Sequence, residues 1–122
     1  MTMLAVIVGA AVGAPLRFLV DRLVTARTSG PDAVHMFPWG LLVVNVSGSA
    51  FAGIVLALTT GDLRLLLLTG FCGAFTTFSG FGWEADRLWA MARPVFWWAV
   101  LMMPAMCVAA FLVTWESAQL LV

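Results

Sequence analysis

Residues 70–84, GFCGAFTTFSGFGWE, lie inside an apolar segment that is long enough to cross a membrane. The stretch contains four glycines, two adjacent threonines, a serine and four phenylalanines. Glycine and paired β-branched threonine weaken a helix in its middle. Carbonyls freed by unwinding at membrane depth need a partner, because lipid offers none, and such breaks often hold a cation. The stretch therefore predicts a broken membrane helix that forms an ion or substrate site.

The composition indicates that lipid is the solvent of this chain. It has 122 residues, of which 63% are hydrophobic and 10% charged, and its mean hydropathy is +1.07. The net charge is zero and there is no basic patch, which argues against a nucleic-acid partner. Cys72 and Cys107 both fall in apolar segments and are expected to be small buried residues rather than a disulfide. We assign no role to His35, a loop residue without metal-ligand companions. No nucleophile–base pair is evident, so we expect no enzyme.

Four spans are expected, making the chain an all-α membrane protein with one domain over residues 1–122. They cover residues 3–23, 38–59, 65–89 and 95–115, each near the ~20 residues needed to cross the hydrocarbon. The first segment lacks a cleavage site and is expected to be retained. The connections between spans are short, so we expect no soluble domain.

The chain is expected to oligomerise, because four helices cannot surround a polar path unaided. Small residues suited to close helix contact occur in the first two spans; they are Gly9, Gly13, Gly48, Ser49, Ala52 and Gly53. The alternative is that these residues only pack helices within one subunit. The sequence leaves both interpretations open.

Phenylalanines recur every three residues at Phe75, Phe78 and Phe81, interleaved with the hydroxyls of Thr76, Thr77 and Ser79. Such a stripe can simply be packing. An aromatic ring has a positive edge, however, and ring edges with hydroxyl and amide donors can replace the water around an anion. They do so without a fixed cation that would hold the anion too tightly.

Three further polar residues are candidates for the same site. Asn45 lies near the middle of the second span, where its NH2 group suits an anion or joins two helices. Arg17 is either a charge at the mouth of the path or a snorkelling side chain that pairs with Asp21. Glu84 ends the motif, where it either caps a vestibule or is solvated.

The motif GFCGAFTTFSGF, with Asn45 in NVSGS upstream and GAPLR in the first span, resembles the Fluc/CrcB family of fluoride channels. The resemblance implies an antiparallel dimer of four-helix subunits in a prokaryotic cell membrane, with two pores that export cytoplasmic fluoride. It also implies a central structural sodium ion (Na+) held by the backbone carbonyls of Gly73 and Thr76. The implied pore residues are Asn45, Phe78 and Phe81, with Ser79 and Thr77 in the polar track beside them.

Two features depart from the family pattern. Gly80 and Gly82 stand where the family usually has hydroxyl residues, and residues 96–113 of the fourth span contain no Ser, Thr or Tyr. The arginines are also uneven, with five on the side of the first and third loops and only Arg64 on the other. The positive-inside rule then predicts both termini outside. We therefore hypothesise a heterodimer with an oppositely oriented paralogue and one degenerate pore, with a homodimer as the alternative.

Two other functions are alternatives to a fluoride channel. A small multidrug-resistance-type, proton-coupled exporter needs a membrane-embedded carboxylate, and the first span has no acid before Asp21. A non-conducting partner subunit needs only helix packing, which does not explain Asn45 or the TTFS run.

Overall fold

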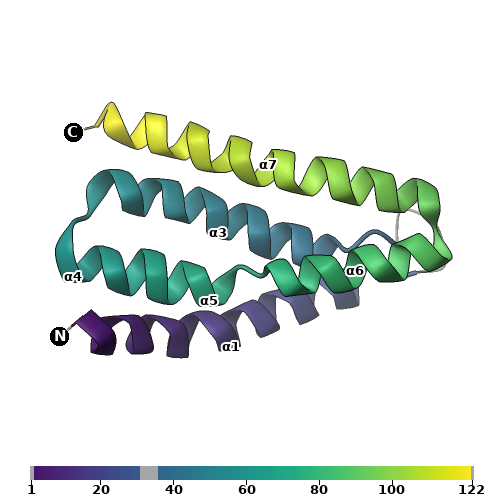
Figure 1. Ribbon diagram of the computed structural model, residues 1–122, viewed down its shortest axis with the longest axis horizontal. Helices are drawn as coiled ribbons and strands as arrows, with labels where there is room; N and C mark the ends of the chain where they lie inside the picture. Colours follow the sequence, from purple (N-terminus) through teal and green to yellow (C-terminus); the bar gives the residue numbers. More distant parts are fainter. Residues whose placement is uncertain (1, 31–35, 122) are drawn as a thin grey trace.

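The computed structural model describes residues 2–30 and 36–121 as a bundle of long helices with both chain ends at the same end of the molecule (Figure 1). His35 and part of the first connection lie outside the described residues. Four helical segments in the described part are long and apolar enough to cross a membrane. They are Thr2–Thr28, Trp39–Leu58, Gly61–Met91 and Arg93–Gln119. The prediction of four long apolar helices is confirmed.

Local sequence explains where these helices begin and end. α1 (Thr2–Thr28) runs five residues beyond the predicted end at residue 23, and α3 (Trp39–Leu58) matches its prediction closely. Gly61 turns the chain after α3 with a φ of +61°, a conformation that glycine adopts without a steric penalty. α7 (Arg93–Gln119) begins with a proline in its first turn, where the missing N–H costs nothing.

The third span is broken near its middle, as predicted. Its first half comprises α4 (Gly61–Arg64), the wide-turned π-helix η1 (Leu65–Cys72) and the short α5 (Gly73–Phe75), and its second half is α6 (Phe78–Met91). Between the halves, Thr76 and Thr77 are extended, with ψ of 161° and 125°. Gly73 is itself helical, with φ −62° and ψ −32°. The threonine pair, rather than the glycines, thus forms the break.

The glycines instead allow close contact between helices of the same subunit. A Cβ at Gly9 would collide with the Leu66 carbonyl oxygen, and one at Gly13 would lie 2.5 Å from that of Phe71, both on η1. Gly48 is covered by Thr76 in the break, and Gly53 lies against α7. Intrasubunit packing therefore accounts for these four glycines.

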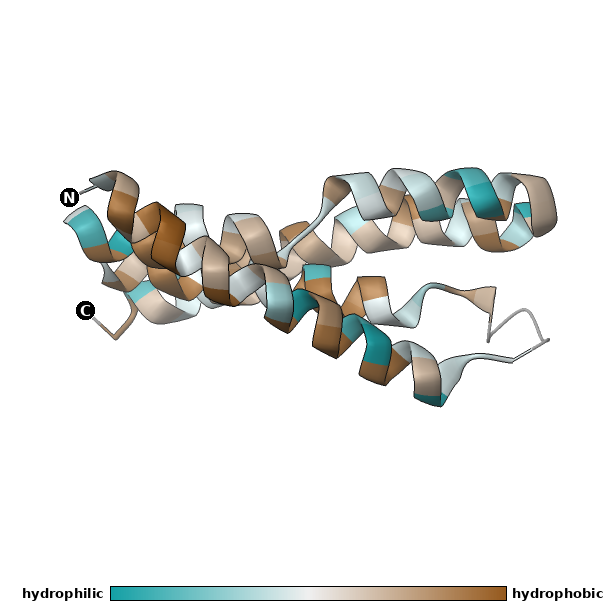
Figure 2. Cartoon of the chain, turned by 90° about the horizontal axis from the view of Figure 1, so that it is seen from below, coloured by the Kyte–Doolittle hydropathy of each residue, from teal (hydrophilic) through white to brown (hydrophobic). Residues whose placement is uncertain are grey.

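Many large apolar side chains are exposed, as expected for a protein whose solvent is lipid, and Figure 2 shows apolar residues along much of the helices. On α1, the buried residues are the two glycines, and large side chains such as Met3 and Phe18 are 82% and 61% exposed. The interior is small and lies around α3 and α7. Two clusters of buried residues lie in it, which are Leu41 with Leu42 and Met103, and Leu88 with Val95 and Ala99.

Candidate functional site

Asn45 holds the break in the third span through its side-chain amide. Its Oδ1 accepts the backbone N–H of Thr77 at 2.8 Å, and its Nδ2 donates to the Thr77 carbonyl at 3.1 Å. Nδ2 also lies 4.0 Å from the sulfur of Met103 on α7. The side chain is buried, with 8% exposed. The amide thus pairs with Thr77 as a neighbouring strand would, which satisfies the backbone where the helix stops.

The break leaves backbone carbonyls without their helical donors. The Thr77 N–H would bond the Gly73 carbonyl in a continuous α-helix, but it donates to Asn45 instead. The Gly80 N–H would bond the Thr76 carbonyl, but it donates to Thr77 Oγ1 at 3.1 Å. The carbonyls of Gly73 and Thr76 therefore lack their α-helical donors in the described part of the chain.

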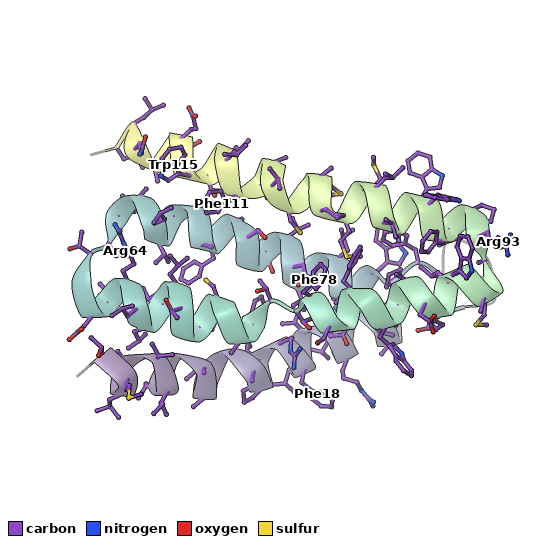
Figure 3. All side chains as sticks on the ribbon, in the orientation of Figure 1. Phe18, Arg64, Phe78, Arg93, Phe111 and Trp115 are labelled. Atoms are coloured by element: carbon purple, nitrogen blue, oxygen red, sulfur yellow. The ribbon has the colours of Figure 1, made fainter. Side chains whose placement is uncertain are left out.

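The second half of the span begins with the predicted aromatic and hydroxyl residues. Phe78 is 85% exposed, and its ring centroid lies 5.8 Å from that of Phe81. Phe81 is partly buried against the cluster that contains Met103. Ser79 Oγ lies 3.2 Å from Thr77 Oγ1, and Figure 3 shows Phe78 near mid-length of the bundle. The first turn of α6 therefore presents two rings and two hydroxyls close to the break.

A cavity of about 720 Å³ leads from the side of the first loop to the break. Thr77 and Gly80 line its inner part, together with Leu41 and Val44 of α3. Charged residues from α1 and α6 also line it, namely Arg17, Asp21, Glu84 and Arg87. This vestibule gives water a route to the middle of the third span.

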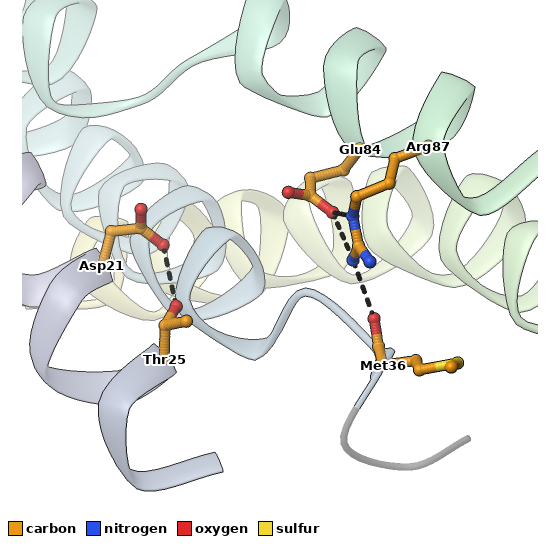
Figure 4. Close-up of polar contacts among 5 residues, drawn as sticks. All are labelled: Asp21, Thr25, Met36, Glu84 and Arg87. Atoms are coloured by element: carbon orange, nitrogen blue, oxygen red, sulfur yellow. Dashed lines mark hydrogen bonds and ion pairs between the residues drawn. The ribbon is translucent and has the colours of Figure 1, made fainter. Parts of the chain in front are cut away.

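The charges of the vestibule are unequally paired. Glu84 and Arg87 form a salt bridge of 2.7 Å, and Arg87 donates to the Met36 carbonyl at 3.0 Å, which ties α6 to the chain entering α3 (Figure 4). On the other side, Asp21 accepts from Thr25 at 3.5 Å. Arg17 makes no ion pair with Asp21 in the described part of the chain. The pair with Asp21 that the sequence offered as one alternative is therefore not seen there, and Arg17 lines the vestibule.

A shallower groove of about 440 Å³ lies on the other side of the break. Gly48, Ser49 and Ala52 of α3 line it together with Gly73 and Thr76. Cys72 and Cys107 also border it, and both are free thiols, as the sequence predicts. The groove places the two residues with freed carbonyls at the surface of the subunit.

Sequence reasoning missed two contacts of this site. The Met103 sulfur beside Asn45 belongs to an apolar run without a distinguishing motif, and the bond from Arg87 to Met36 joins residues 51 positions apart. The i, i+3 spacing of Glu84 and Arg87 was the available signal for that salt bridge.

Comparison with known proteins gives one consistent family. The family model described as CrcB-like protein, Camphor Resistance (CrcB), matches residues 4–117. Fluoride-specific ion channel FluC 1 of Nocardia farcinica is 49% identical over 84 residues, which are 68% of this chain but only 56% of that relative. FluC 1 of Streptomyces avermitilis is 46% identical and covers 72% of this chain and 71% of its own length. FluC of Mesorhizobium japonicum is 32% identical over 97% of both chains.

Proposed function

This chain belongs to the CrcB-like protein family, and on that premise we propose that it forms a passive, fluoride-selective channel in a prokaryotic cell membrane. The observation that carries the proposal is the broken third span, whose two rings and two hydroxyls lie beside a vestibule that reaches the break. Export of one anion from a negative interior is driven by about 2.3 kcal/mol per 100 mV. Such a channel needs no energy-coupling domain and no catalytic residue.

The proposed ion path runs from the vestibule past Thr77 and Ser79 to Phe78 and Phe81. Ring edges and hydroxyls offer partial positive charge without a fixed cation, so the ion is bound weakly enough to leave. Asn45 lies at the same depth, but its amide is already bonded to Thr77. Its contribution to the path is therefore to hold Thr77 in place, and any contact with the ion competes with those bonds.

A structural sodium ion fits the donor chemistry of the break. The carbonyls of Gly73 and Thr76 lack their helical donors, and neutral oxygen ligands suit a hard cation. Two carbonyls make only part of a coordination shell, so a second chain would supply the rest. When bound, Na+ would stabilise the two half-helices against each other and neutralise the carbonyl dipoles.

The proposed assembly is an antiparallel dimer with two pores. Support comes from the groove that borders the break, because Gly73 and Thr76 line it and lipid offers their carbonyls no partner. The uneven arginines favour one orientation for this chain, and hence a heterodimer with an oppositely oriented paralogue. A homodimer is the alternative.

One observation favours a second function, that of a non-conducting partner subunit. The fourth span places the Met103 sulfur beside Asn45 and offers no hydroxyl over residues 96–113. If the fourth span lines part of the polar track, that part of the track would lack hydrogen-bond donors. In a heterodimer, one of the two pores would then be degenerate.

The decisive test is fluoride efflux from liposomes that contain this chain alone, with the potential clamped by a potassium ionophore. Fast fluoride loss with chloride retained supports the channel and a homodimer. Absence of efflux that is restored by adding the candidate paralogue supports the partner subunit. Absence of efflux in both cases contradicts the proposed function.

Two substitutions test the proposed path in the conducting assembly. Phe78→Ile removes a ring edge, and Asn45→Asp removes the donor to the Thr77 carbonyl. Each should reduce fluoride flux while the size-exclusion profile of the assembly is unchanged. Flux at the original rate in both variants contradicts the assignment of these residues.

A further inference from the structure

The turn between α6 and α7 carries a cluster of aromatic side chains that we call the aromatic corner, consisting of Trp89, Phe96 and Trp97. The Trp89 ring meets that of Phe96 at 5.1 Å and that of Trp97 at 6.5 Å, and Phe96 meets Trp97 at 5.2 Å, all edge to face. The two indoles are nevertheless 45% and 54% exposed. The corner is thus a preformed aromatic surface that faces outward.

Arg93 adds a positive charge to this surface. Its guanidinium carbon lies 4.6 Å from the centre of the Trp89 ring, a cation–π contact that orients the planar group. Arg93 makes no ion pair within residues 2–30 and 36–121. A guanidinium stacked by its face keeps its N–H edges free, and these edges match the oxygens of a phosphate.

The corner lies at the depth of the lipid headgroups. Trp89 follows Phe78 by eleven residues of α6, which corresponds to about 16 Å of helix. The break lies near the middle of the span, and half of the hydrocarbon core is about 15 Å. Indoles are enriched at this boundary.

Charge indicates the kind of lipid. Five of the six arginines lie on this side of the bundle and outnumber its described carboxylates, Asp21, Glu84 and Asp86. The positive-inside rule places this side at the anionic cytoplasmic leaflet. We propose that the aromatic corner and Arg93 bind the headgroup of an anionic phospholipid. The phosphate contacts the Arg93 guanidinium and the interfacial part of the lipid rests on the indoles.

Quenching of tryptophan fluorescence by brominated lipids tests this inference without reference to ion flux. The full chain is reconstituted in phosphatidylcholine vesicles that contain either brominated phosphatidylglycerol or brominated phosphatidylcholine. We expect stronger quenching by the brominated phosphatidylglycerol. Arg93→Gln should lower the preference by about fivefold, the contribution of one arginine near a membrane surface.

Arg27→Gln is the matched control. Arg27 is exposed at the end of α1 on the same side, so its loss changes the net charge equally but leaves the corner intact. This variant should keep the preference for phosphatidylglycerol, and Arg93→Lys should keep part of it. Equal quenching by the two lipids in the original chain overturns the proposal. So does an equal loss in Arg93→Gln and Arg27→Gln, which would indicate only general surface charge.

Discussion

Replacing Asn45 by leucine should loosen the break in the third span, and a native cysteine can report it. Leucine has the same branched skeleton of four heavy atoms but cannot bond the N–H and carbonyl of Thr77, which Asn45 holds at 2.8 and 3.1 Å. Each bond contributes between about 0.6 kcal/mol, the mean for interhelical bonds in a membrane protein, and about 1 kcal/mol. Opening of the break should therefore become easier by roughly 1.2–2 kcal/mol, which is about a sevenfold to thirtyfold change in the equilibrium.

Cys72 lies in the last turns before the break and is only 5% exposed, so its reaction with N-ethylmaleimide depends on opening. With Cys107 replaced by alanine, Cys72 is the only thiol of the chain. In detergent, Asn45→Leu should raise its labelling rate by the same sevenfold to thirtyfold factor.

Ser47→Ala is the control for this measurement. Its hydroxyl bonds only carbonyls of its own helix, those of Val43 at 2.6 Å and Val44 at 3.2 Å. The control should change the labelling rate by less than about twofold, because such backbonding contributes little to helix stability. A labelling rate in Asn45→Leu within that same range would refute the idea that Asn45 holds the break.

Four further outcomes are expected. Thr77→Val should lower the unfolding free energy by about 1 kcal/mol in detergent, because it removes the acceptor of the Gly80 N–H at the start of α6, whereas Thr77→Ser should not. Gly9→Ala should lower the thermal midpoint measured by circular dichroism, since the added Cβ meets the Leu66 carbonyl, whereas Val8→Ala on the exposed face should be tolerated. A C-terminal tag should be reached only from outside the cell, and equal labelling from both faces would contradict the fixed orientation. Arg64→Gln should not reduce this bias in orientation, because it removes the arginine on the opposite side. The substitution also removes the hydrogen bonds that Arg64 donates to the carbonyls of Thr59 and Leu56.

The broken span was predictable because its composition conflicts with a membrane helix, but the position of the break was less so. The sequence pointed equally to glycines and threonines. The structure uses Gly70 for contact with Val6 and Gly9 of α1 and lets the chain unwind at Thr76 and Thr77. Glycine permits both unwinding of a helix and close contact between helices, and only the position of the neighbouring helix decides between the two.

The role of Asn45 illustrates what a single sequence leaves open. Its burial and polarity predict that the amide must be bonded, and both an ion and a neighbouring helix satisfy that requirement. The partner, Thr77, is 32 residues away, and the Met103 contact is 58 residues away. No local pattern encodes such pairs, so the hydrogen bonds of Asn45 to Thr77 at the break are visible only once the helices are placed.

The break lies close to the centre of the third span, with α4 to α5 on one side and α6 on the other. A chain turned upside down would therefore keep its break at nearly the same depth. Two oppositely oriented chains could thus bring the carbonyls of Gly73 and Thr76 from both copies together at mid-membrane. Exposed to lipid, those carbonyls would cost several kcal/mol each. In the proposed antiparallel dimer, an inverted partner would therefore cover the carbonyls that one subunit leaves without helical donors.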